Sequence, residues 1–377
     1  MNQALGLYIH IPFCRQRCHF CAFYLEVHRE PAAEAFVSAL HSELRLYAGE
    51  AHTAGRPLQS IYFGGGTPTV LTVPQLTGIL DAVRRSFVVH QDCEVTVEAH
   101  PGTVTESGLS ALRRAGVTRL SFGAESMHDA ELAEIGRPGA GAETIDAVTA
   151  ARRAGFTNLN LDLMYGLPGQ TLESWMRTLN ACCDISPSHL SCYALTVESG
   201  TRFAKDVCRN PERAPDETRQ IEMERAAEAL LAEAGYARYE ISNYAKPGFE
   251  CRHNLLYWTQ GEYLGLGPSA QSFVDGVRFG NVADLTIYRT ALAESRLPVD
   301  ERTVLSLREQ LRDAVIFGLR LTRGMPTAAV NDHAANYGYR QVVDRLRAQK
   351  FLEDDGDRTR LSMKGRLHAD TVAEQLF

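Results

Sequence analysis

Six short apolar segments alternate with six amphipathic segments, and this order constrains the fold more than any other feature of the chain. The apolar segments span residues 7–13, 60–66, 94–100, 119–126, 158–166 and 190–198. The segments that follow them place apolar residues at the three- and four-residue spacing of helices, and several end in glycine, which suits a helix C-terminus. Strands that alternate with helices pair in parallel, so we expect an α/β fold, either a barrel or a doubly wound sheet.

The character of the sequence changes at about residue 284. Helical patterns lie at 307–321 and from residue 339 on, and a predicted hairpin at 351–363 has a charged turn that contains glycine. Helices followed by such a hairpin resemble a small winged-helix module. We therefore expect two domains, one over 1–283 and a small C-terminal α+β, winged-helix-like domain over 284–377.

Charge and hydropathy exclude several classes of protein. The formal net charge of −7 argues against a protein built for phosphate-backbone contacts, so we do not expect a nucleic acid as partner. No run approaches the roughly 18 apolar residues of a membrane span. The N-terminal sequence MNQALGLYIHIPF lacks the basic region and the cleavage site of a signal peptide, so we expect a cytoplasmic protein.

Three of the nine cysteines, Cys14, Cys18 and Cys21, lie within eight residues. The other six are scattered, and an odd number without regular spacing is a poor disulfide framework. With His19 beside them, the three thiols allow a Cys3His zinc site, although zinc sites usually pair their ligands in separated C-x2-C units. Three thiolates on one loop can instead bind three irons of a [4Fe–4S] cluster and leave the fourth iron open to a substrate.

The sequence YIHIPFCRQRCHFC, with its C-x3-C-x2-C spacing, resembles the radical S-adenosylmethionine (SAM) superfamily. Within it, the chain is similar to the oxygen-independent coproporphyrinogen III oxidases and the related heme chaperones. Further motifs recur in the same order, namely GGGTPT at 64–69, VEAHPGT at 97–103, NLDLMYGLPGQT at 160–171, HNLLYW at 253–258 and YLGLGPSAQSF at 263–273. The resemblance covers residues 5–280 well and the C-terminal part loosely.

This resemblance implies a partial (β/α)6 radical SAM barrel. It implies that Cys14, Cys18 and Cys21 hold a [4Fe–4S] cluster, whose open iron binds SAM and whose electron breaks it into a 5′-deoxyadenosyl radical. A small-molecule substrate and an electron donor of the flavodoxin or ferredoxin type are the implied partners.

The resemblance also assigns site residues by position. Tyr8, Gly65 and Glu98 match positions that contact this SAM, and glycines at 64–66 are expected to let the backbone approach its methionyl part. The family can hold a second SAM, for which the matching positions are Phe20, Gly66, Thr67, Glu125, Arg137, Asp162 and Ala194. Because Asp162 lies in a strongly apolar strand, where a charge is costly without a partner, it indicates either a site residue or a buried ion pair.

Three positions help to choose between subgroups. Coproporphyrinogen oxidases usually have a further cysteine where this chain has Phe23. The sequence HNLLYW resembles one associated with heme contact in the heme chaperones, so His253 is a candidate axial ligand, and the alternative is a histidine that structures its turn. Glu125 stands where glutamine is usual, and a carboxylate, unlike an amide, can accept a proton as a base.

Two functions from different classes therefore compete. The first is an enzyme of the class C radical SAM methyltransferase or cyclopropanase type, in which Glu125 removes a proton while a second SAM gives carbon to a small organic substrate. The second is a heme chaperone that binds heme and inserts it into partner proteins. Glu125, and Gln271 where histidine is common, favour the enzyme.

Overall fold

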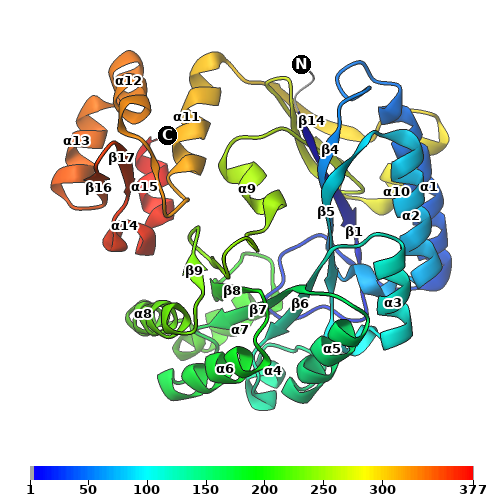
Figure 1. Cartoon of the computed structure of the whole chain (residues 1–377), viewed down its shortest axis with the longest axis horizontal. Helices are drawn as coiled ribbons and strands as arrows, with labels where there is room; N and C mark the ends of the chain where they lie inside the picture. Colours follow the sequence, from blue (N-terminus) through cyan, green and yellow to red (C-terminus); the bar gives the residue numbers. More distant parts are fainter. Residues whose placement is uncertain (1–3, 377) are drawn as a thin grey trace.

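A partial barrel of parallel strands forms the main body of the protein. The computed structural model describes residues 4–376; residues 1–3 and 377, which the two expected domains include, lie outside the described residues. The barrel strands are β1 (Leu5–Ile11), β4 (Leu58–Gly65), β5 (Val89–Ala99), β6 (Arg119–Glu125), β7 (Asn158–Tyr165) and β8 (His189–Ala194). They pair in this order, each parallel to the next. The α/β barrel expected from the sequence is confirmed, and Figure 1 shows its open, curved sheet.

Helices cover the outer face of this sheet (Figure 1). The six expected ones are α1 (Glu30–Ala48), α2 (Val73–Ser86), α3 (Glu106–Arg114), α5 (Gly141–Arg153), α6 (Leu172–Ile185) and α8 (Glu217–Glu233). Two short helices, α4 (Asp129–Glu134) and α7 (Arg202–Arg209), were not expected. Local sequence fixes where helices begin: at the start of α2, the Thr72 hydroxyl accepts the Gln75 N–H, and the Gln75 side chain accepts the Thr72 N–H.

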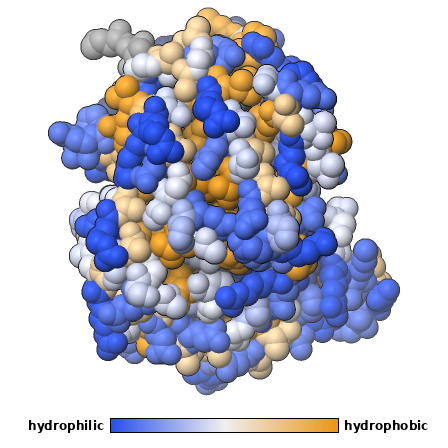
Figure 2. All heavy atoms as spheres, turned by 90° about the vertical axis from the view of Figure 1, so that its right-hand side faces the viewer, coloured by the Kyte–Doolittle hydropathy of each residue, from blue (hydrophilic) through white to orange (hydrophobic). Residues whose placement is uncertain are grey.

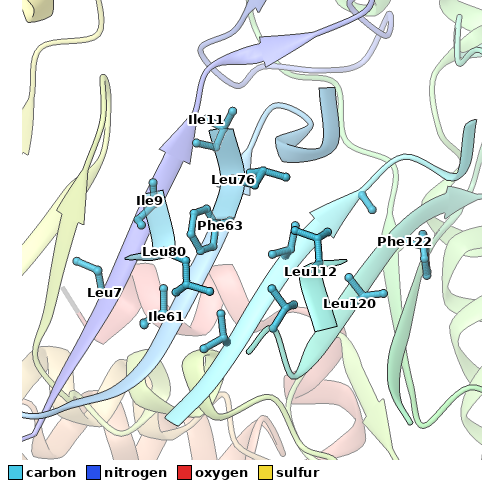
Figure 3. Close-up of a cluster of buried hydrophobic side chains, with 14 of the residues drawn as sticks. Leu7, Ile9, Ile11, Ile61, Phe63, Leu76, Leu80, Leu112, Leu120 and Phe122 are labelled. Atoms are coloured by element: carbon cyan, nitrogen blue, oxygen red, sulfur yellow. The ribbon is translucent and has the colours of Figure 1, made fainter. Parts of the chain in front are cut away.

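The main core lies between the sheet and these helices. Outward-facing residues of neighbouring strands, such as Ile9 and Phe63, pack with Leu80 of α2 and with one another (Figure 3). Burying each such side chain stabilises the fold by about 1.5–3 kcal/mol. The exposed side of α1 and α2 is mostly hydrophilic, with smaller hydrophobic areas between (Figure 2).

The sheet extends beyond the barrel at both edges, which the sequence analysis missed. Strand β11 (Tyr263–Leu266) pairs in parallel with β1 and continues into β12 (Gln271–Val274), β13 (Val277–Asn281) and β14 (Val299–Val304), all antiparallel. At the other edge, β10 (Asn243–Ala245) joins β8 to β9 (Ala237–Arg238). Within residues 4–376, this sheet has twelve strands. Several of the added strands are too short to show a recognisable alternation.

A second, smaller core belongs to the C-terminal part. It consists of α11 (Leu307–Gly318), α12 (Thr327–Tyr337), α13 (Arg340–Ala348), β15 (Met325–Pro326), β16 (Leu352–Asp355), β17 (Arg358–Leu361), α14 (Met363–Leu367) and α15 (Ala369–Leu376). Its buried residues form a cluster of their own, and β16 and β17 form the expected hairpin. Within residues 4–376, no helix is both long and apolar enough to cross a membrane.

The segment between the two parts packs with the barrel. Tyr288 of α10 (Leu285–Ala293) lies in the main core, and β14 belongs to the large sheet. The domain boundary at residue 284 stays a prediction, and this packing leads us to propose a boundary after Val304 instead.

One buried carboxylate ties this segment to α1. Glu43 is fully buried and accepts hydrogen bonds from the Tyr288 hydroxyl at 2.6 Å, the Asn281 amide at 2.6 Å and the Gly267 N–H at 2.8 Å. Burial disfavours the charged form more than these three donors favour it, so the pKa of Glu43 is raised to about 7.

This pKa predicts a pH-dependent contribution to stability. Because the pKa is raised on folding, the contribution is present in full below about pH 4.5 and is lost as the pH rises through about 7. The unfolding free energy of the wild type, relative to Glu43→Gln, should therefore fall by up to about 3 kcal/mol between pH 4.5 and 8. Urea unfolding of both proteins at both pH values measures this difference in unfolding free energy. Glu34→Gln, on the exposed side of α1, is the control, and an equal difference at both pH values would contradict the assignment.

Candidate functional site

The three cysteines lie on a loop that closes on itself. The loop leaves β2 (Phe13–Cys14) and returns at β3 (Glu26–Val27), and these two strands pair in parallel. Within it, the Arg17 guanidinium donates hydrogen bonds to the carbonyl oxygens of Cys21, Phe23 and Leu25. The loop therefore keeps its shape through its own backbone and one arginine.

Phe20 fastens this cysteine loop to the barrel. Its ring packs against a small apolar cluster that consists of Ile135, Met164, Leu167, Leu195 and Phe203. On either side, the His19 N–H donates to the Ile135 carbonyl at 2.9 Å, and the Phe203 N–H donates to the His19 carbonyl at 2.8 Å. The structure thus gives Phe20 an anchoring role, and its contact with a second SAM stays a prediction.

The glycine loop, residues 64–67 at the end of β4, packs against the start of the cysteine loop. The Gly66 N–H donates to the Ile11 carbonyl at 2.9 Å, and the Thr67 N–H donates to the Phe13 carbonyl at 2.7 Å. A Cβ atom at position 66 would lie 2.5 Å from the Phe13 carbonyl oxygen. Glycine is therefore required here because the two loops pack backbone against backbone.

At position 65, both the backbone conformation and a close contact exclude a side chain. Its φ of +106° is a conformation that side chains rarely adopt, and a Cβ atom would lie 2.5 Å from the His10 ring. The sequence analysis attributed the glycine run to close approach of SAM. The contacts within the protein already require glycine at this position, and the SAM contact stays a prediction.

Glu98 lies next to this loop, at the end of β5. It accepts hydrogen bonds from the Tyr62 hydroxyl at 2.8 Å and from the Gly65 N–H at 3.2 Å. Burial, with a smaller contribution from the nearby charge of Asp162, raises the pKa of Glu98 to about 7. The Tyr8 hydroxyl, on β1, lies within hydrogen-bond distance of His10 Nδ1, at 3.1 Å. Tyr8, Gly65 and Glu98 lie together around Gly64, and their contact with SAM stays a prediction.

Glu125 and Arg137 form an ion pair beside the cysteine loop. Arg137 Nη1 lies 3.6 Å from Glu125 Oε1 and 3.9 Å from the Sγ atom of Cys18, and Arg137 also donates to the Gly123 carbonyl. Only 12–13% of either charged side chain is exposed. Burial raises the pKa of Glu125 to about 7, against the opposing effect of Arg137. Glu125 also has a positive φ of 63°, at a bulge between β6 and β7.

Asp162 lies on the inner face of the barrel without a salt bridge to any described residue. Its two oxygens accept hydrogen bonds from Ser121 at 3.0 Å and from Asn160 at 2.9 Å. The sequence analysis did not select Ser121, Asn160 or Tyr62. The signal was present, because each is a polar residue at an alternate position of an otherwise apolar strand. Ala194, at the end of β8, pairs with Tyr165 of β7.

The thiols fit a cluster better than a single zinc ion. Burial raises the pKa of all three, whereas the Thr67 hydroxyl, 3.3 Å from Cys14, and Arg137, beside Cys18, favour their thiolate forms. Among residues 4–376, no three cysteine, histidine or carboxylate side chains converge on one metal ion. The His19 ring lies against Gly136. Three thiols, each free to bind a different iron, match a [4Fe–4S] cluster with one open iron.

His253 lies elsewhere, at the opposite end of the barrel strands. It belongs to α9 (Arg252–Trp258) and is buried, with hydrogen bonds from its ring to the Ser60 hydroxyl at 2.9 Å and the Tyr257 hydroxyl at 3.0 Å. Its ring stacks on Tyr62 with 5.1 Å between centroids, and burial lowers the pKa of His253 to about 3. Neither nitrogen is free for iron in this conformation, so its role as an axial heme ligand stays a prediction that requires α9 to move.

Comparison with known proteins agrees with this geometry. The family model described as the radical SAM superfamily matches residues 8–182, and that of the HemN C-terminal domain matches residues 305–368. The structure of coproporphyrinogen III oxidase (HemN) from Escherichia coli superimposes with a TM-score of 0.87 at 25% identity, over 100% of this chain and 90% of that one.

Curated relatives match over nearly their full length. The heme chaperone HemW of Mycobacterium tuberculosis (strain H37Rv) is 36% identical over 379 residues, which cover 100% of this chain and 95% of that protein. The heme chaperone HemW of Bacillus subtilis is 35% identical over 373 residues, which cover 97% of each. This chain belongs to the HemN/HemW-like group of the radical SAM superfamily. Its cofactors are accordingly a [4Fe–4S] cluster and SAM.

The same comparison corrects the sequence analysis. A class C methyltransferase or cyclopropanase was favoured there, and this prediction is wrong, because relatives that match over 71–97% of their own length are named heme chaperone HemW. Glu125 then has no carbon transfer to assist as a base. In this HemN/HemW-like chain its carboxylate is instead paired with Arg137.

The glycine loop provides a test of the site's construction. Gly65→Ala should destabilise the protein by at least about 2 kcal/mol and lower its iron content after reconstitution, because the strained φ and the contact with His10 displace the loop that supports the cysteines. Thermal unfolding and iron analysis measure both effects. Gly78→Ala, where a Cβ atom meets nothing within 4 Å, is the control and should be neutral or stabilising. Normal iron content in Gly65→Ala would contradict this account.

Proposed function

We propose that this protein is a heme chaperone, which binds heme on a radical SAM scaffold and passes it to proteins that require it. The observation that carries the proposal is the match to relatives named heme chaperone HemW, at 35–36% identity over at least 95% of each. Phe23, in place of the further cysteine of the coproporphyrinogen oxidases, supports the same choice.

The cluster and SAM provide one-electron chemistry when bound. Cys14, Cys18 and Cys21 would hold the cluster, and the polar groups around Glu98 and the glycine loop would orient SAM beside it. The proposal retains a one-electron donor of the flavodoxin or ferredoxin type as a partner, in addition to the proteins that receive heme.

An aromatic cavity next to α9 is the surface that we assign to heme. It has a volume of about 260 Å³, lies between α9 and α11, and is lined by Tyr257, Trp258, Tyr263, Phe273 and Phe317. Aromatic rings suit the flat face of a porphyrin. Arg278, which pairs with Asp313 at 2.9 Å, lines the cavity, and the Arg320 guanidinium lies 4.5 Å from the Trp258 ring centroid, so two cations border the surface where the propionates would lie. The cavity is smaller than typical ligand pockets, so the macrocycle would enter by its edge.

Heme titration tests the function and the surface together. The full chain should bind one heme, measured by absorbance, and should transfer it to a heme-free acceptor protein. Phe317→Ala should weaken binding about tenfold, which corresponds to about 1.4 kcal/mol of lost ring contact. Phe351→Ala, an aromatic residue of the C-terminal core outside the cavity, should bind like the wild type. A chain that binds no heme would contradict the proposed function, whereas equal affinities in both variants would contradict only the surface.

A further inference from the structure

The three cysteines differ in the groups that contact their sulfur atoms. Cys14 meets the neutral hydroxyl of Thr67 at 3.3 Å, whereas Cys18 meets the charged guanidinium of Arg137 at 3.9 Å. Among the described residues, Cys18 is the one member of the trio with a charged hydrogen-bond donor on its sulfur. The electrostatic environment of the three cluster ligands is therefore uneven.

Arg137 has a second charged contact in the same place. Its Nη1 atom also lies 3.6 Å from Glu125 Oε1, so one nitrogen faces both a carboxylate and a thiol. A further donor bond to the Gly123 carbonyl holds the guanidinium in position. Because the Arg137 and Glu125 side chains are largely buried, water screens their charges little. Removing either charge therefore changes the electrostatic potential at the Cys18 sulfur.

We propose that Arg137 is a positioning residue that raises the reduction potential of the cluster through Cys18, and that Glu125 offsets part of this effect. Reduction adds negative charge to the cluster. A charged donor on a thiolate ligand stabilises the reduced state, and a nearby carboxylate destabilises it. Glu125 in place of glutamine would therefore make the cluster harder to reduce. The inference needs the cluster but not heme binding, so it can fail while the proposed function stands.

Potentiometric titration of the reconstituted cluster, followed by electron paramagnetic resonance without SAM or heme, tests this assignment. The titrations are run at pH 8.5, where the Glu125 carboxylate is charged. Arg137→Gln should lower the ratio of reduced to oxidised cluster at a fixed potential about tenfold, which is about 59 mV for one electron. Glu125→Gln should shift the potential in the opposite direction, and Arg137→Lys should stay closer to the wild type.

Arg15→Gln is the matched control. Arg15 lies on the same cysteine loop, is exposed, and donates to the Gly102 carbonyl at 3.0 Å instead of to a thiol. Its loss should leave the potential nearly unchanged. If Arg137→Gln does not retain a cluster, Glu125→Gln alone decides the question, because it leaves Arg137 in place. Shifts of the same sign in the Arg137 and Glu125 variants, or no shift in Glu125→Gln, would overturn the proposal.

Discussion

The alternation of side chains along the parallel strands determines both the core and the site. In β6, Leu120 and Phe122 face the helices while Arg119 and Ser121 face the barrel interior, and β4 places Tyr62 inward beside Phe63 outward. Leu120, Phe122 and Phe63 lie in the main apolar core. Ser121 and Tyr62 on the inner face make hydrogen bonds to carboxylates, because an unpaired polar group away from water costs several kcal/mol. A shift of one residue in register would exchange the two faces, so the same pairing that buries the core also brings the polar groups together.

Much of the fold could be predicted because its strands and helices are long and regular. The six barrel strands and six covering helices lie within a few residues of the expected segments. The extension of the sheet by β9–β14 could not be predicted, since its strands are mostly short and do not continue the regular alternation of strand and helix. Their positions depend on pairing with β8, on pairing with β1 and on contacts such as Glu43 with Tyr288. The last two join residues more than 200 positions apart.

The sequence named candidate site residues, but it could not show how they contact one another. The cysteines, Glu98 and Arg137 came from motifs, and the structure brings them to one end of the barrel. That Gly65 is required by the His10 ring, and that both His253 nitrogens are occupied, follows only from which residues meet in space. The charge of Glu125 suggested a base when considered alone. In the structure this carboxylate is the ion-pair partner of Arg137.

Everything proposed for this protein depends on three thiols on one loop, which would hold a [4Fe–4S] cluster with an iron left open for SAM. Iron and sulfide analysis of the anaerobically reconstituted chain, combined with electron paramagnetic resonance of the reduced protein with and without SAM, tests it most directly. The account predicts four irons and four sulfides per chain and a spectrum that SAM changes, because SAM binds the open iron. One bound zinc ion, or a cluster whose spectrum SAM leaves unchanged, would contradict it.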